Sequence, residues 1–291
     1  MFYDLNVPYA ADDAEMASTL NFLAELGYTT VALSQTVTGK LPANIAPPKF
    51  PANPPKSLTL LNRLNIVLSD PAQNSRLTTL TQLYSIIALR PTNEKALLNA
   101  CTSLDCDIIS IDLSVRQPYH FKMKTVAAAI ARGIRFEICY SPGVTGSGLD
   151  ARRNLIANAM ALIRATRGRG IIISSEAKRT LGVRAPMDVV NLACVWGLSQ
   201  ERGKEAVCEE ARKVVALAKL KRTSWRGVVD VIDGGESSNQ DKEKDKSGNN
   251  GDNLKRKTPS DSAPEHEKPL SKREMKRRAK KARLEASATA S

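Results

Sequence analysis

Polar side chains follow several short apolar stretches of the chain, at points where parallel strands would end. The opening stretch "FYDLNVPY" contains Asp4 and Asn6, and Asp112 and Glu176 follow later apolar runs. Because the carboxyl ends of the strands in a barrel meet on one face, we expect these side chains to lie together. Asp4, Asp112 and Glu176 are one candidate magnesium site, since hard cations accept carboxylates alone; carboxylates that only hydrogen-bond the barrel rim are the other interpretation. The strand-end residues are Asn6, Ser34, Asp70, Arg90, Asp112, Tyr140, Ser141, Ser174, Ser175 and Glu176.

Histidine is scarce, which limits the chemistry that the chain could perform. Only His120 and His266 occur. A histidine-rich metal centre needs several imidazoles, and a Ser-His-Asp or Cys-His nucleophile needs a histidine beside it. We therefore predict no catalytic residue and no metal site on this chain, with the magnesium site as the alternative.

Basic residues recur in the predicted loops. Arginine grips phosphate with two parallel hydrogen bonds, so loop arginines are good candidates for nucleic-acid contacts. In "LDARRN", two arginines begin a predicted helix, where an RNA phosphate would also meet free backbone amides. The predicted RNA-binding residues are Arg90, Arg116, Lys122, Lys124, Arg152, Arg153, Arg167, Arg169, Lys178, Arg179 and Arg184.

Short apolar runs alternate with helical patterns, and this alternation predicts the elements that position those residues. Eight such repeats without hairpin signals favour an α/β fold of the TIM-like (β/α) barrel type, and an open doubly wound sheet is the alternative. The proline-rich stretch at about residues 40–57 is predicted to be an extended insertion. The predicted strands cover residues 2–7, 29–34, 64–69, 84–89, 107–113, 135–140, 170–174 and 213–217. The predicted helices cover residues 12–26, 93–104, 126–132, 150–166 and 199–211.

The net charge of +13 is distributed unevenly. Between residues 151 and 232, Lys and Arg outnumber Asp and Glu by 16 to 7. A basic face on a compact domain is typical of a protein that binds a polyanion, most often nucleic acid. A basic surface that is merely solvated is the other interpretation.

The composition changes near residue 233, after which apolar residues become rare. We predict a barrel domain over residues 1–232 and a disordered basic tail over residues 233–291. Within the tail, "SKREMKRRAKKAR" (residues 271–283) is typical of a nuclear localisation signal or of an arm that orders on RNA; a solubilising tail is the alternative. Five scattered cysteines without a C-x-x-C pair favour a reducing compartment, nuclear or cytosolic. No apolar run is long enough for a membrane span.

Eight short motifs carry a resemblance to a known family. In order along residues 1–232, "FYDLNVP", "LRPTNE", "DIISIDLS", "AAIARGIRFEICYSP", "RRNLIANAMAL", "GIIISSEA", "RAPMDVVNL" and "WGLS" resemble the thirty-kilodalton-class protein subunit of archaeal and eukaryotic ribonuclease P and ribonuclease MRP. That family is a TIM-like barrel related to the PHP metallohydrolases, whose first strand ends in D-L-H-x-H. Here Asn6 and Pro8 stand at the two histidine positions, so the resemblance implies a barrel without the ancestral metal chemistry.

The resemblance implies a non-catalytic subunit of a nuclear and nucleolar ribonucleoprotein. In this interpretation the catalytic RNA, with Mg²⁺ bound to it, removes the 5′ leader of precursor tRNA, and the MRP complex takes part in rRNA processing. The implied partners are that RNA, a small ferredoxin-like protein subunit, other complex proteins and, indirectly, precursor tRNA, with no membrane. Two alternatives stay open: a metal-dependent PHP-like phosphoesterase that uses carboxylate ligands, and a nuclear scaffold that binds no RNA.

Overall fold

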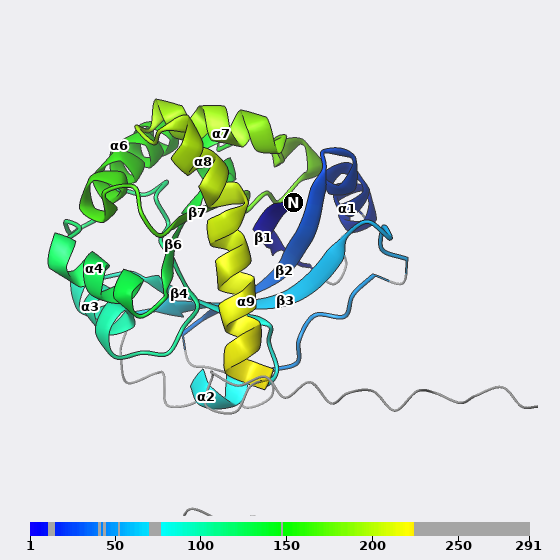
Figure 1. The fold of residues 1–291 in the computed structure, drawn as a ribbon, viewed down its shortest axis with the longest axis horizontal. Helices are drawn as coiled ribbons and strands as arrows, with labels where there is room; N and C mark the ends of the chain where they lie inside the picture. Colours follow the sequence, from blue (N-terminus) through cyan, green and yellow to red (C-terminus); the bar gives the residue numbers. More distant parts are fainter. Residues whose placement is uncertain are drawn as a thin grey trace, which may run out of the picture. The chain divides into compact units, whose positions relative to one another are not determined.

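The computed structural model describes residues 1–10, 15–39, 42, 45–51, 53–69, 77–146 and 148–223. Within these ranges the strands form one sheet, in which every neighbouring pair is parallel and the spatial order follows the chain order (Figure 1). The strands are β1 (Phe2–Pro8), β2 (Tyr28–Thr38), β3 (Thr59–Leu68), β4 (Ile86–Pro91), β5 (Ile108–Ser110), β6 (Arg135–Cys139) and β7 (Ile171–Ser174). The first seven predicted strands overlap these.

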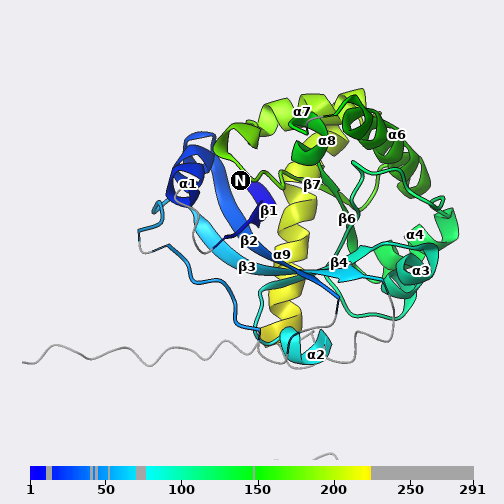
Figure 2. The same cartoon turned by 180° about the vertical axis from the view of Figure 1, so that it is seen from behind.

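Helices follow most strands, and α1, α3, α4, α6 and α7 lie around the outside of the sheet (Figures 1 and 2). This arrangement buries both faces of the strands, and most of their buried side chains are apolar. The helices are α1 (Met16–Glu25), α2 (Leu77–Leu80), α3 (Glu94–Thr102), α4 (Met123–Ala131), α5 (Ser141–Val144), α6 (Leu149–Thr166), the short 3-10 helix η2 (Thr180–Gly182), α7 (Pro186–Val195), α8 (Gln200–Val207) and α9 (Glu209–Thr223).

The edge strands β1 and β7 come together and nearly close the sheet into a barrel. The backbone N–H of Glu176, just after β7, donates to the carbonyl oxygen of Asn6 in β1 at 2.8 Å. One residue earlier, the N–H of Ser175 donates to Oδ1 of Asp4 at 3.1 Å. The predicted TIM-like barrel is therefore confirmed, and the open doubly wound sheet is wrong.

The predicted eighth strand is wrong, because residues 213–217 lie inside helix α9. Two adjacent valines favoured a strand there, yet the flanking Glu, Ala, Lys and Arg residues are strong helix formers. The buried residues Ala211, Val214 and Ala218 recur at spacings of three and four, which is one face of a helix. Ala211 and Val214 pack in the same buried cluster as Leu5 of β1. This segment thus forms a helix and not an eighth strand, and it supplies apolar side chains to the barrel interior.

Helix α9 is held at the barrel end where the strands begin (Figure 1). Asp107, just before β5, accepts from Nη2 of Arg222 at 2.7 Å and from the N–H of Ile87 at 3.0 Å through the same oxygen. Nε of Arg222 also donates to the carbonyl oxygen of Tyr84 at 2.7 Å. The opposite end, where the strands finish, therefore carries the loops that could form a site.

Local capping signals explain two of the observed helix starts. The side chain of Asn93 accepts from the N–H of Ala96 at the start of α3, and Ser199 caps α8 in the same way. The helix predicted over residues 199–211 is instead two helices, because the backbone at Cys208 leaves the helical region (φ −117°, ψ −80°). In α6, Leu155, Ala159, Leu162 and Ile163 are buried at the spacing of one helical face.

The proline-rich stretch connects β2 to β3, and its described residues form no helix or strand. The hydroxyl of Tyr84 donates to the carbonyl oxygen of Ala46 at 3.0 Å, which ties this connection to the barrel. Asp70, the predicted boundary at residue 232 and the basic segment at residues 271–283 lie outside the described residues. Within the described ranges, no helix is long and apolar enough to cross a membrane.

Candidate functional site at the strand C-termini

A buried ion pair crosses the interior of the barrel. Arg63 in β3 and Glu137 in β6 are both 0% exposed, and the two guanidinium nitrogens Nη1 and Nη2 each lie 2.5 Å from one carboxylate oxygen. Burial alone would raise the pKa of Glu137, but the charge and hydrogen bonds of Arg63 outweigh burial and lower this pKa to about 2. Glu137 is therefore ionised, and the chain's own guanidinium balances its charge.

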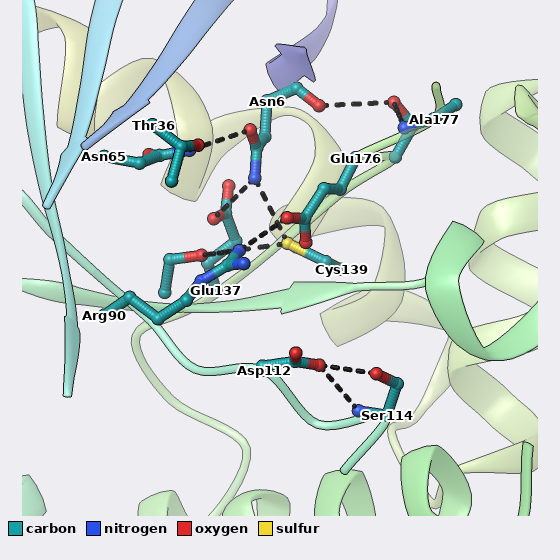
Figure 3. A network of polar contacts seen from close by, with 12 residues as sticks. Asn6, Thr36, Asn65, Arg90, Asp112, Ser114, Glu137, Cys139, Glu176 and Ala177 are labelled. Carbon is teal, nitrogen blue, oxygen red and sulfur yellow. Dashed lines mark hydrogen bonds and ion pairs between the residues drawn. The ribbon is translucent and has the colours of Figure 1, made fainter. Parts of the chain in front are cut away.

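Asn6 contacts Glu137 of this ion pair and Cys139, the last residue of β6 (Figure 3). Its Nδ2 donates to Oε2 of Glu137 at 3.3 Å and to Sγ of Cys139 at 3.3 Å. Its Oδ1 accepts from Nδ2 of Asn65 at 3.3 Å, and Oδ1 of Asn65 accepts from Nε of Arg63 at 2.6 Å. The Asn6 amide thus belongs to a buried hydrogen-bond network that joins β1, β3 and β6 across the barrel interior.

Closer to the barrel mouth, Arg90 and Glu176 form a second ion pair (Figure 3). Nη2 of Arg90 lies 2.7 Å from Oε1 of Glu176 and 3.3 Å from Oγ of Ser110, and the two paired side chains are only 14% and 16% exposed. Glu176 has a φ of 52°, a left-handed conformation that costs an L-residue roughly 1–2 kcal/mol. Arg90 is therefore engaged inside the protein, and its predicted contact with RNA stays a prediction.

The three carboxylates of the candidate magnesium site each have other partners. Oδ1 of Asp4 accepts from the N–H groups of Ser175 and Asn6, and burial raises the pKa of Asp4 to about 6. Asp112 accepts from the N–H and Oγ of Ser114, and Glu176 pairs with an arginine (Figure 3). Among the described residues, no three His, Cys, Asp or Glu side chains are grouped so that they could hold a metal ion.

Seven of the predicted RNA-binding residues lie exposed on the loops and helix starts that follow β5, β6 and β7, and five of these, without Lys122 and Lys124 at the start of α4, form one group. Hydrogen bonds join these segments: Nδ2 of Asn154 donates to the carbonyl oxygen of Ser114, and the N–H of Arg184 donates to Oη of Tyr140 at 2.9 Å. The five side chains therefore share one sector of the barrel mouth, which we call the basic rim. The basic rim consists of Arg116, Arg152, Arg153, Lys178 and Arg179.

Two further predicted residues near this sector already have partners. Nη1 of Arg184 donates to the carbonyl oxygens of Leu181 and Val183, at 2.7 Å and 3.0 Å. Nζ of Lys122 lies 2.6 Å from Oε1 of Glu94 in an exposed pair. Exposed ion pairs contribute little stability and open easily, so Lys122 is still accessible.

The last three predicted residues do not join the basic rim. Arg167 and Arg169 lie in the turn between α6 and β7, at the end of the barrel where the strands begin. Lys124 lies in the first turn of α4, and all three line one hollow on the side of the barrel. The sequence analysis grouped these residues with the other candidates because all of them lie in predicted loops.

Sequence reasoning missed Arg63 and Glu137, although a signal for them exists. Each is a charged residue within a largely apolar strand sequence: Glu137 is flanked on both sides by apolar residues in "RFEIC", and Arg63 is followed by one in "LNRLNIVL". Charges of that kind are rarely buried unless they are paired. Opposite charges in two such strands of one barrel therefore predict a buried pair.

Comparison with known proteins agrees with this architecture. The model of the family described as RNase P subunit p30 matches residues 1–223. A protein of Schizosaccharomyces pombe, "Probable ribonuclease P protein subunit 3", is 37% identical over 79% of this chain and 98% of its own length. The mouse "Ribonuclease P protein subunit p30" is 32% identical over 79% of this chain and 90% of its own. The Saccharomyces cerevisiae "Ribonuclease P/MRP protein subunit RPP1" is 30% identical over 83% and 88%.

A solved structure shares the fold. A chain in the cryo-EM structure of archaeal ribonuclease P with mature tRNA superposes with a TM-score of 0.59 at 16% identity, over 80% of this chain and 99% of that one. The match of residues 1–223 and the near full-length relatives lead to one conclusion. The chain belongs to the RNase P subunit p30 family.

Proposed function

We propose that this chain is a non-catalytic subunit of nuclear ribonuclease P, and of ribonuclease MRP, that braces the complex's RNA with the basic rim. Catalysis, tRNA 5′-leader removal and the Mg²⁺ it needs are then properties of the RNA, and the work is done in the nucleus and nucleolus. The family and the names of its relatives support the assignment to ribonuclease P. The name of the yeast relative supports the assignment to MRP.

The observation that carries the RNA-bracing role is the placement of the basic rim. Its five cations come from three consecutive strand ends, and none has a carboxylate partner closer than the 3.9 Å between Arg153 and Asp150 among the described residues. Arg153 is 82% exposed in its side chain, so its guanidinium is free to meet a phosphate. Arg152 and Arg153 also flank the N-terminus of α6, whose 18 residues place the positive end of a helix dipole at the same point.

The barrel interior supports a binding role in a second way. Glu137 inside the barrel and Glu176 near its mouth are each paired with an arginine of the chain. The charges of these two carboxylates are therefore balanced within the protein. The mouth therefore presents the unpaired positive charge of the basic rim to a partner.

Charge reversal at the basic rim tests this proposal. The variant Arg152→Glu/Arg153→Glu is compared with Arg212→Glu/Lys219→Glu, which reverses two exposed cations on α9 at the other end of the barrel. Binding to the ribonuclease P RNA, with the partner proteins present, is measured between about 50 and 200 mM salt. We expect the rim variant to bind more weakly. The slope of log binding constant against log salt concentration should become shallower by about 0.7–0.9 for each phosphate contact removed. Equal binding by the two variants would refute the role of the rim.

A further inference from the structure

A hollow of about 510 Å³ lies between helices α4 and α6, away from the basic rim. Its lining is largely aliphatic and small, with cations at its edges. The apolar lining comes from Met123, Ala127, Ile130 and Ala131 of α4 and from Ala165 of α6. Met123 is 49% exposed, and Ala127 and Ala131 are also exposed. A helix that leaves this row of apolar side chains in water is typical of a surface that another protein covers.

Three cations surround this hollow, which we call the α4–α6 groove. They are Lys124, Arg167 and Arg169, and none of them has an acidic partner among the described residues. The C-terminus of α6 carries only about half a negative charge, which one cation would balance. The groove therefore has an excess of positive charge beside apolar side chains.

The turn that supplies two of these cations is built tightly against α4. Gly170 has a φ of +63°, and a Cβ there would come within 3.0 Å of Cγ1 of Ile130. Arg167 ends α6 with a φ of 56°, at a position where helices usually place glycine. An L-residue in that conformation costs roughly 1–2 kcal/mol, so an arginine persists there at the expense of stability. Such strain concentrates at positions where the side chain serves a function.

We infer that the α4–α6 groove binds an amphipathic helical segment of a partner protein, with aliphatic side chains toward the groove and carboxylates at its edges. The aliphatic lining favours a protein segment over an RNA backbone, because a phosphate chain would leave the methyl groups without apolar contacts. Lys124 and Ala131 stand seven residues apart on α4, or about 10 Å along its axis. The segment should therefore carry Asp or Glu about two helical turns apart, so that one reaches Lys124 and the other reaches Arg167 and Arg169.

This inference deepens the proposed function, since it assigns the protein-facing surface of the same subunit, and photo-crosslinking tests it. p-Benzoylphenylalanine replaces Ala127 in the full-length chain, and in a matched control it replaces Ala216, an exposed alanine on α9. The chain is isolated in its ribonucleoprotein complex, irradiated, and the crosslinked products are identified by mass spectrometry. We expect position 127 alone to crosslink to one protein segment that has aliphatic residues between acidic residues two turns apart.

Charge reversal then shows whether the groove cations recognise that segment. Arg167→Glu/Arg169→Glu should lower the crosslink yield at position 127 at least tenfold, and the reciprocal Asp or Glu→Arg change in the segment should restore it. Crosslinks to RNA, a segment without acidic residues, or a yield unchanged by the reversal would each overturn the inference.

The presence of the ribonuclease P RNA in the same isolated complex is measured separately. If that RNA is present but position 127 crosslinks to no protein, only the groove inference fails. If the acidic segment crosslinks but no such RNA is present, only the proposed function fails.

Discussion

Replacing Glu137 by Gln should be among the most destabilising single changes to this barrel, because it leaves the Arg63 guanidinium buried without a counter-charge. Both side chains are 0% exposed, so water cannot compensate for the lost carboxylate. Removing one partner of a buried ion pair costs about 3–5 kcal/mol. The pKa of Glu137 gives a similar figure: its drop from 4.5 to about 2 corresponds to about 3 kcal/mol of stabilisation.

Urea unfolding followed by far-ultraviolet circular dichroism at pH 7 measures this loss. The matched control is Glu205→Gln, which removes an exposed pair with Arg202 and should cost less than about 1 kcal/mol. The double variant Arg63→Met/Glu137→Gln contains no unpaired charge and should be less destabilised than the two single changes added together. A loss below about 1 kcal/mol for Glu137→Gln, or strict additivity in the double variant, would refute the account of a charge-balanced interior.

The same ion pair makes a prediction about pH. The pKa of Glu137 is lower in the folded protein than in the unfolded chain, so its contribution is fully present above about pH 4.5 and is lost as the pH falls toward 2. Wild type should therefore lose about 3 kcal/mol over this window relative to Glu137→Gln. If the free energy of unfolding fell by the same amount in both proteins as the pH is lowered, the assigned pairing would be contradicted.

Three further changes test individual contacts. Burial raises the pKa of Asp4 to about 6, so the folded protein holds a proton more tightly than the unfolded chain does. The free energy of unfolding of wild type should therefore fall as the pH rises from about 4 to 6, and that of Asp4→Asn should not show this fall. Asn93→Ala removes the 2.7 Å cap on the N–H of Ala96 and should cost about 1 kcal/mol in the free energy of unfolding, whereas Asn93→Asp should cost much less. Gly143→Ala would place a Cβ 2.5 Å from a methyl of Leu155 and should cost about 1–3 kcal/mol, measured by urea unfolding; a neutral result would mean that α5 and α6 separate easily.

Local sequence signals predict most of the fold. Short apolar runs locate seven strands, and Asn93 and Ser199 locate helix starts, because periodicity and capping are local properties. The failure at residues 213–217 has a physical cause. Five residues that contain Val-Val fit a strand or a helix equally well, and only the packing of Val214 against the barrel interior decides between them.

The candidate site is less predictable, because it depends on which strand ends meet. Arg63 and Glu137 are 74 residues apart, and their pairing follows from the register of a nearly closed sheet. The split of the basic residues was predictable in principle. Arg167 and Arg169 precede a strand, whereas Lys178 and Arg179 follow it, so the two pairs belong to opposite ends of the barrel.

The guanidinium of Arg63 is covalently part of the chain, and this has a consequence for how the barrel matures. A cation supplied from solution must be acquired after synthesis and can dissociate, and the protein must compete for it with cellular chelators. The positive charge opposite Glu137 arrives with translation and cannot leave. The electrostatic balance of this interior is therefore set in a unimolecular folding step, at the same stoichiometry in every molecule and under any supply of ions.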